Sequence, residues 1–118
     1  MDIDFFNKNK KKNLKESVKK ILDKYPDKVP LYVTKSKNDK ILKDINKNKF
    51  IVPESITVGQ FLSIIRKRID LNSEMALFVF INNILPLQSA TLGALYYEHK
   101  NSDGLLELEY CGENTFGI

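Results

Sequence analysis

Apolar residues return at regular intervals along most of the chain, and the interval changes from one segment to the next. In residues 14–25 the apolar positions share one side of a helix: Leu14, Val18, Ile21, Leu22 and Tyr25. This spacing predicts an amphipathic helix. Asn13 and Glu16 make a capping pair at its start. The helix is expected to end before Pro26, because the residue that precedes a proline avoids the helical region.

Two strand-like segments and a second helix follow. Residues 28–35, KVPLYVTK, alternate between core and solvent positions, which is the period of a half-buried strand. Residues 50–53, FIVP, form a second β segment. Residues 57–68 return to helical spacing, with Thr57 and Gln60 as a capping box. The predicted inward face of this helix carries Val58, Phe61, Leu62, Ile65 and Ile69.

The last third of the chain predicts two strands around a short helix. Residues 76–81, ALFVFI, are rich in β-forming side chains and fit a central strand, and the Asn82-Asn83 pair supplies a tight turn that tolerates positive φ. Residues 89–99 predict a short helix, and residues 105–110, LLELEY, alternate as a strand. The inward positions are Leu92, Leu95 and Tyr96 on the helix, and Leu106, Leu108 and Tyr110 on the strand. Leu105, Glu107 and Glu109 are predicted to point outward.

This order of elements predicts an α+β fold with a mixed sheet and with helices packed across one face. The length of 118 residues fits one domain. We divide it into an N-terminal arm or short helix at residues 1–13, a folded domain at 14–111 and a C-terminal tail at 112–118.

Composition narrows the classes of function. Hydrophobic residues make up 42% of the chain and charged residues 29%, as in globular proteins. The apolar run at residues 75–81 is too short to cross a bilayer, and the first residues lack the apolar segment of a secretory signal. We therefore expect a cytoplasmic protein.

The residues that carry most enzyme and metal chemistry are scarce. Cys111 is the one cysteine and His99 the one histidine, so neither a disulfide nor a metal-ligand pattern is available. No nucleophile elbow, zinc-protease motif or phosphate-binding loop occurs. We expect no enzyme activity, no metal and no cofactor, with Cys111 an inert thiol and His99 a polar residue at a helix end.

The net charge of +4 hides a division between the two halves of the chain. Residues 1–49 carry 15 lysines and 7 acidic residues, a net charge of +8, whereas residues 50–118 carry 4 basic and 8 acidic residues, a net charge of −4. The cationic half could meet acidic peptides, anionic lipid or nucleic acid, or could simply be a solvated face. Specific nucleic-acid binding is disfavoured, because the lysines are not interleaved with aromatic side chains.

Six short strings, in order along the chain, carry a resemblance to a known family. They are YPDKVP (25–30), KNKFIVP (47–53), TVGQF (57–61), IRKRI (65–69), FINN (80–83) and SATLGALYYEH (89–99). Together they resemble the autophagy ubiquitin-like modifiers, in particular the branch of the GABA-receptor-associated protein and the microtubule-associated light chains. The resemblance implies a ubiquitin-like β-grasp fold with a four-stranded mixed sheet and an N-terminal helical extension.

The resemblance also implies a use for the C-terminal sequence ENTFGI. A cysteine protease would remove Ile118, and E1-like and E2-like enzymes would then transfer the exposed carboxylate of Gly117 to phosphatidylethanolamine. Glycine suits this chemistry because it has no Cβ to clash in a narrow enzyme channel. Phe116 would anchor the tail, and residues 112–115 would stay flexible. The alternatives are a modifier attached to a protein and an adaptor that is never conjugated.

A second implication is a peptide-binding surface at the exposed edge of the FIVP strand. Partners would carry a short motif with an aromatic and an aliphatic residue three positions apart. The pocket for the aromatic residue would use Ile21, Pro30, Tyr32, Lys49, Ile51 and Leu105. The pocket for the aliphatic residue would use Phe50, Val52, Pro53, Ile56, Phe61 and Ile64. Acidic residues that flank the motif would meet Lys28, Lys47, Lys49 and Arg68.

Some positions stand apart from the family pattern. Ser17 replaces an acidic residue common beside the first pocket, and Tyr32 and Leu105 replace isoleucine and phenylalanine. Leu105 lies on the acidic side of its strand, and an exposed pocket would explain an apolar residue there. Phe5 and Phe6 could cover the core or touch a membrane. We expect a monomer before conjugation, and an autophagosomal or related membrane as the location after it.

Overall fold

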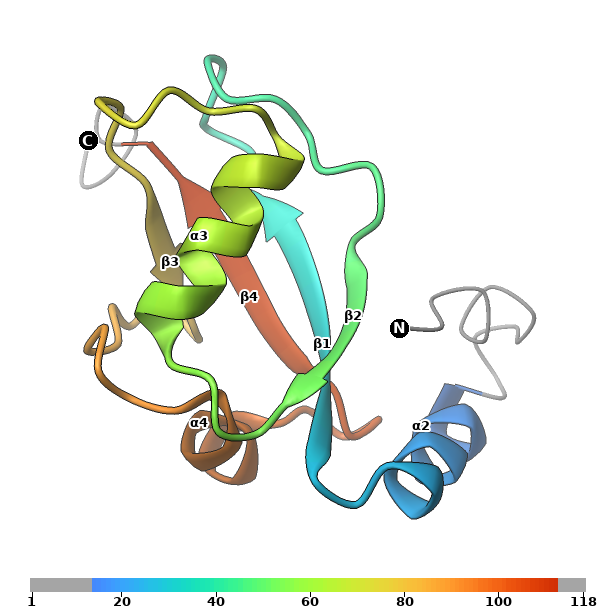
Figure 1. The fold of residues 1–118 in the computed structure, drawn as a ribbon. Coiled ribbons are helices and arrows are strands. Elements are labelled where there is room, and N and C mark those ends of the chain that lie inside the picture. The colour runs from blue at the N-terminus through green and yellow to red at the C-terminus, as the bar shows by residue number, and fades with distance from the viewer. Residues whose placement is uncertain (1–13, 113–118) are drawn as a thin grey trace.

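The computed structural model describes residues 14–112. Over this range the chain forms helices and strands in the predicted order (Figure 1). They are α2 (Leu14–Lys24), β1 (Lys28–Lys35), β2 (Lys49–Pro53), α3 (Val58–Arg68), β3 (Phe78–Phe80), α4 (Leu92–His99) and β4 (Leu106–Cys111). The predicted arm at residues 1–13 and the tail beyond Gly112, including Phe116, Gly117 and Ile118, lie outside the described residues.

The strands form one four-stranded sheet in the order β2-β1-β4-β3. β1 pairs with β2 in antiparallel fashion and with β4 in parallel, and β3 pairs antiparallel with β4. The predicted mixed sheet is therefore confirmed. Its two central strands, β1 and β4, come from opposite ends of the described chain.

The main hydrophobic core lies between the sheet and α3, which crosses one face of the sheet (Figure 1). Alternate residues of the strands point into it, because successive side chains of a strand face opposite ways. All five residues predicted for the inward face of α3 are buried. The strand residues of this core are Val29, Leu31, Val33, Phe50, Val52, Val79, Leu106, Leu108 and Tyr110.

α2 packs on the other face of the sheet, so the prediction that the helices share one face was wrong. Val18 and Ile21 of α2 form a separate buried cluster with Ile51 of β2 and Leu105, just before β4. Ile51 lies between two residues that face α3, so strand alternation directs it to the opposite face. We call this group of four residues the outer cluster. The sequence pattern predicted the apolar stripe of α2 correctly but could not show which face it covers.

Local signals in the sequence set several boundaries. The capping box is confirmed: the Thr57 hydroxyl accepts the N–H of Gln60 at 3.1 Å, and the Gln60 side chain accepts the N–H of Thr57 at 2.9 Å. Asn82 and Asn83 adopt positive φ values of 51° and 65° in the predicted tight turn. α2 ends two residues before Pro26, as expected.

The segment 76–81 departs from its prediction as a central strand. Only Phe78–Phe80 pairs as β3, and this strand lies at an edge of the sheet. Its apolar character has another cause, because Leu77, Val79 and Ile81 all enter the main core. Residues 76–81 therefore resemble a strand that is buried on both faces, although they lie at an edge of the sheet and bury alternate residues.

Candidate functional site

The edge of the sheet formed by β2 can accept a further strand. β2 pairs only with β1 among residues 14–112. Two backbone hydrogen bonds frame this pairing, from the N–H of Val33 to the carbonyl of Asn48 at 2.7 Å and from the N–H of Glu54 to the carbonyl of Asp27 at 2.9 Å. Antiparallel ladders alternate, so the backbone of Ile51, midway between them, points away from β1. An extended peptide could pair with the sheet there.

The six residues predicted for the aromatic pocket come together beside this edge. Ile21, Ile51 and Leu105 belong to the outer cluster, and Tyr32 packs against it. Pro30 lies opposite Ile51 in the ladder, and Lys49 lies opposite Tyr32. The predicted set is thus contiguous and links α2, β1, β2 and the start of β4.

Leu105 itself requires a correction. Its predicted outward position suggested an exposed pocket with no core to join, yet the side chain is only 4% exposed. α2 covers it through Val18 and Ile21. The sequence pattern missed this contact because a second packed face cannot be read from the alternation of one strand.

Apart from Pro53, the second predicted set lies on the α3 side of the same edge, but its members differ in exposure. Phe50, Val52 and Phe61 are buried in the main core, where the rings of Phe50 and Phe61 meet edge to face with centroids 5.5 Å apart. Ile56 and Ile64 are half-buried and pack against that core. Pro53 is exposed at the end of β2. A ligand side chain at this surface would contact Ile56 and Ile64.

The predicted basic residues surround the two sets. The guanidinium of Arg68 lies 5.1 Å from the centroid of the Phe50 ring, and the ammonium of Lys28 lies 5.0 Å from that of Tyr25. Lys47 is exposed just before β2, and Lys49 is partly exposed at its start. These cations can attract acidic residues of a ligand, and each exposed pair contributes less than about 1 kcal/mol.

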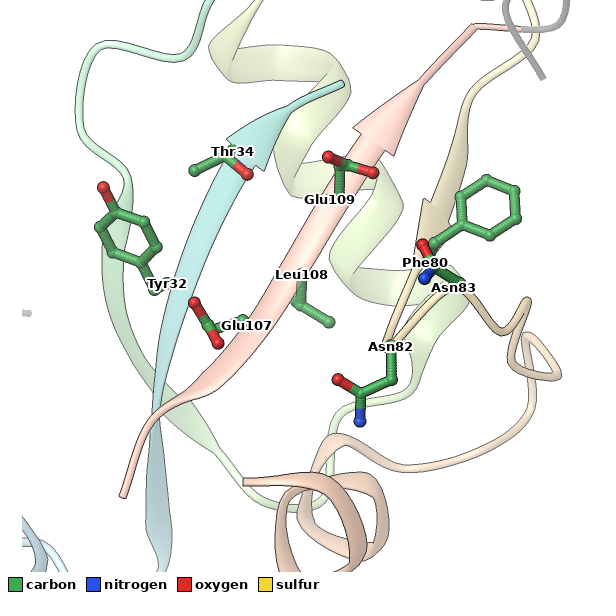
Figure 2. Close-up of a pocket in the computed structure, with 8 residues that line it drawn as sticks. All are labelled: Tyr32, Thr34, Phe80, Asn82, Asn83, Glu107, Leu108 and Glu109. Atoms are coloured by element: carbon green, nitrogen blue, oxygen red, sulfur yellow. The ribbon is translucent and has the colours of Figure 1, made fainter. Parts of the chain in front are cut away.

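Two surface cavities are separate from these sets, apart from Tyr32, and sequence reasoning did not anticipate them. The first, of about 240 Å³, lies on the sheet face away from α3, and Figure 2 shows Glu107 and Glu109 beside it. Its lining is Tyr32, Thr34, Phe80, Asn82, Asn83, Glu107, Leu108 and Glu109. Its two carboxylates give it an acidic character. The strand alternation of LLELEY placed these glutamates outward, but the hollow depends on the neighbouring turn.

The second cavity, of about 290 Å³, lies between α2 and the connection from α4 to β4. Its lining is Lys15, Val18, Lys19, Leu22, Lys100, Asn101, Ser102, Asp103 and Gly104. Val18 and Leu22 contribute apolar surface, and the three lysines come from both sides. Lys100 also lies 5.5 Å from the ring centroids of both Tyr96 and Tyr97.

Sequence reasoning also missed the buried carboxylate of Asp39, which is 1% exposed. Burial by itself raises the pKa of this carboxyl, but hydrogen bonds from the backbone N–H groups of Leu42, Gly112 and Ile41, together with the charge of Lys35, bring the pKa below its usual value. The available signal was an aspartate in a polar stretch followed by Ile41 and Leu42, which is typical of an Asx turn.

Cys111 and His99 take the places expected of them. Cys111 is a buried cysteine in β4, and His99 ends α4, where its Nδ1 lies 3.3 Å from the amide nitrogen of Asn82. Across residues 14–112, no three histidine, cysteine, aspartate or glutamate side chains are placed to hold a metal ion.

Comparison with known proteins assigns this arrangement to a class. Residues 12–117 match the family model described as "Autophagy protein Atg8 ubiquitin like". Autophagy-related protein 8d of Arabidopsis thaliana is 47% identical over 90 residues, which cover 76% of this chain and 74% of that protein. Autophagy-related protein 8 of Candida albicans is 51% identical over 89 residues, which cover 75% of this chain and 65% of the relative.

A solved structure agrees with these relatives. The crystal structure of Trypanosoma brucei ATG8 superimposes with a TM-score of 0.84 at 36% sequence identity, and the match covers 92% of this chain and 93% of that one. A mixed four-stranded sheet with a helix across one face, matched in this way, defines a ubiquitin-like protein. The chain belongs to the Atg8 family of autophagy proteins.

Family membership settles the broad class of function. Atg8 proteins are ubiquitin-like modifiers in autophagy and are not themselves enzymes, and the family implies a conjugation machinery and autophagy receptors as partners. No helix within residues 14–112 is long and apolar enough to span a bilayer.

Proposed function

We propose that this protein is a modifier that is joined to phosphatidylethanolamine through Gly117. A cysteine protease removes Ile118, an E1-like enzyme activates the Gly117 carboxylate with ATP, and an E2-like enzyme transfers it from a thioester to the lipid amine. The observation that carries this proposal is the family match over residues 12–117, which includes Gly117 and stops one residue before Ile118. After conjugation the protein acts on the autophagosomal or a related membrane.

The same proposal assigns the β2 edge to the recruitment of partners. Residues three positions apart in an extended peptide point to opposite faces, because side chains alternate along a strand. A peptide paired with β2 would therefore direct its aromatic residue toward the outer cluster and its aliphatic residue toward Ile56 and Ile64 on the α3 side. The positions of the two residue sets on opposite faces support this assignment.

Mass spectrometry of a reconstituted reaction tests the conjugation. The chain that ends at Gly117 is incubated with the E1-like and E2-like enzymes, ATP and liposomes that contain phosphatidylethanolamine. We expect a product heavier by one lipid. Gly117→Ala in the same truncated chain is expected to lose the product, because its Cβ enters the space needed at the adenylate and thioester centres. Absence of a lipid product from the unsubstituted chain, under conditions in which a relative reacts, would refute this function.

Two alternatives give different masses in cells. A modifier attached to proteins would appear as a covalent adduct with a polypeptide in place of lipid. An adaptor that is never conjugated would keep Ile118. The mass of the intact protein recovered from cells therefore separates all three, since it reports both trimming and attachment.

A further inference from the structure

The buried carboxylate of Asp39 joins two distant parts of the chain. Its Oδ1 accepts hydrogen bonds from the N–H groups of Ile41 and Leu42, both at 2.8 Å. Its Oδ2 accepts the N–H of Gly112 at 2.7 Å, across 73 positions of sequence. Gly112 directly follows β4 and is the first residue of the predicted C-terminal tail. We call the Asp39 carboxylate and these three N–H groups the tail clamp.

The tail clamp has the features of a strong polar contact. Hydrogen bonds to an ionised carboxylate are shorter and stronger than those between neutral groups, and Asp39 itself is buried. The ammonium of Lys35 also donates to the backbone carbonyl of Asp39 at 2.5 Å. The peptide-binding edge and the conjugation chemistry proposed above do not use this carboxylate, so its burial calls for another explanation.

A second set of contacts holds the same loop to β4. The hydroxyl of Tyr110 donates to the carbonyl of Lys43 at 2.6 Å, and the N–H of Ser36 donates to the carbonyl of Tyr110 at 2.8 Å. The loop after β1 is therefore fixed to the end of β4 on both sides of Asp39. The Asp39 carboxylate that accepts the N–H of Gly112 is therefore held in a fixed position.

We propose that Asp39 is a positioning residue that fixes the point from which the tail leaves the domain. This inference rests on the proposed function, because its purpose is the presentation of Gly117 to the enzymes that trim and activate it. Residues 113–117 can span at most about 17 Å when fully extended. The tail is short, so Gly117 stays within a small volume relative to the folded domain if Gly112 is held in place. An enzyme that binds the domain then meets Gly117 in that volume.

Loss of the tail clamp adds backbone freedom that an enzyme must remove when it takes up the tail. One freed residue corresponds to a loss of about five- to thirty-fold in kcat/KM for trimming. The loss should appear mainly as a higher KM, because the tail that reaches the protease is chemically unchanged.

Two substitutions break the tail clamp from opposite sides. Asp39→Asn keeps the size of the side chain, but in either orientation its NH₂ group faces at least one backbone N–H. Gly112→Pro keeps the aspartate at position 39 but removes the N–H donor and puts a ring carbon in its place, which displaces the carboxylate. Gly112→Ala is the matched control, because it keeps the N–H and its Cβ would lie at 3.4 Å from the Asp39 Oδ2, which is ordinary contact. Asp44→Asn makes the same change of charge at an exposed position of the same loop.

Three measurements on the full chain decide the question. The rate at which iodoacetamide alkylates Cys111, the one cysteine and the neighbour of Gly112, reports whether the end of β4 is held. The kcat and KM of trimming by the purified cysteine protease of an Atg8 relative report the position of the tail. The affinity of an aromatic-x-x-aliphatic peptide reports whether the domain is intact.

We expect Asp39→Asn and Gly112→Pro each to speed alkylation and to lower kcat/KM by about five- to thirty-fold through KM, with the double variant no worse than either single one. Peptide affinity and both control variants should match the unsubstituted protein. Faster alkylation with unchanged trimming, or unchanged alkylation in both variants, would overturn the proposal. Failure of the unsubstituted chain to be trimmed would instead refute the proposed function, and alkylation would still report whether the contact holds β4.

Discussion

The two faces of the sheet are packed to very different extents. Among residues 14–112, the face under α3 contributes to a core of twenty buried residues, whereas the face under α2 contributes to the four buried residues of the outer cluster. Hydrophobic stabilisation scales with the apolar area removed from water, so α2 is held much less firmly than α3. The β2 edge lies between these faces. A binding site at this edge would therefore be bordered by the firmly packed α3 side and by the less firmly packed α2 side.

The difference in packing between the two faces matches the difference in size between the aromatic and the aliphatic residue of the proposed ligand. The outer cluster is closed in the free protein, with Ile21 and Ile51 at 2% and 3% exposure. An aromatic residue could enter the outer cluster if α2 moved, and elements with few buried contacts are those that open at low free energy. On the α3 side, Ile56 and Ile64 already offer surface, so a smaller aliphatic residue can bind without rearrangement.

The largest expected effect comes from the main core. Phe61→Ala removes a ring that is 1% exposed and contacts Phe50 edge to face, and it should lower the free energy of unfolding by about 3–5 kcal/mol. Urea unfolding followed by circular dichroism measures this change. Lys67→Ala, at an exposed position of the same helix, is the control and should change little. A loss below about 1 kcal/mol for Phe61→Ala would show that the α3 face is not the rigid one.

A smaller loss of stability and a larger loss of binding are expected in the outer cluster. Leu105→Ala should destabilise the protein by about 2 kcal/mol, near the lower limit for such truncations, because α2 can settle into the space. Affinity for an aromatic-x-x-aliphatic peptide should fall at least about tenfold, since the aromatic residue loses an apolar contact. Isothermal titration calorimetry gives the affinity. Leu22→Ala, which alters the edge of the same cluster outside the predicted pocket, should leave binding nearly unchanged.

The smallest expected effect comes from Tyr110, a core residue whose hydroxyl donates a hydrogen bond to the loop after β1. Tyr110→Phe removes the bond to Lys43 and should cost about 1 kcal/mol at neutral pH. Burial, aided by the charges of Asp44 and Asp39, raises the pKa of Tyr110 to about 12. The folded state then holds the proton more tightly than the unfolded state, so stability is lost as pH rises from about 10 to about 12.

Urea unfolding at several alkaline pH values measures that dependence. The slope of stability with pH between about 10 and 12 should be shallower in Tyr110→Phe than in the unsubstituted protein. Equal slopes for the two proteins would contradict the assignment of this proton to Tyr110.

Local patterns in the sequence predicted much of the fold. The errors in that prediction concern contacts between segments that are distant in the chain. The capping box of α3 and the Asn82-Asn83 turn are complete within a few residues, so the sequence predicted both. The side of the sheet covered by α2 depends on Ile51 and Leu105, which lie far apart in the chain, and periodicity within α2 carries no information about them. The same limit made residues 76–81 resemble a central strand.

The candidate site divides in the same way. The resemblance to a family supplied the two sets of pocket residues, and the structure brings each set together beside β2. That Phe50 and Phe61 lie in the core could not be read from the strings, because the same side chains can line a pocket or fill an interior. The Asx-turn pattern at Asp39 indicates only its contacts with Ile41 and Leu42. Its contact with Gly112 escaped notice because it spans 73 positions and uses only a backbone N–H.

The parallel pairing of β1 with β4 has a consequence for biosynthesis. β1 cannot acquire its second neighbour, and β3 has no neighbour at all, until residues 106–111 have left the ribosome and inserted between them. Closure of the sheet therefore waits for β4, and it requires contacts of long sequence separation, which form slowly. A chain interrupted before β4 would therefore leave β1 with β2 as its one partner strand and β3 with none.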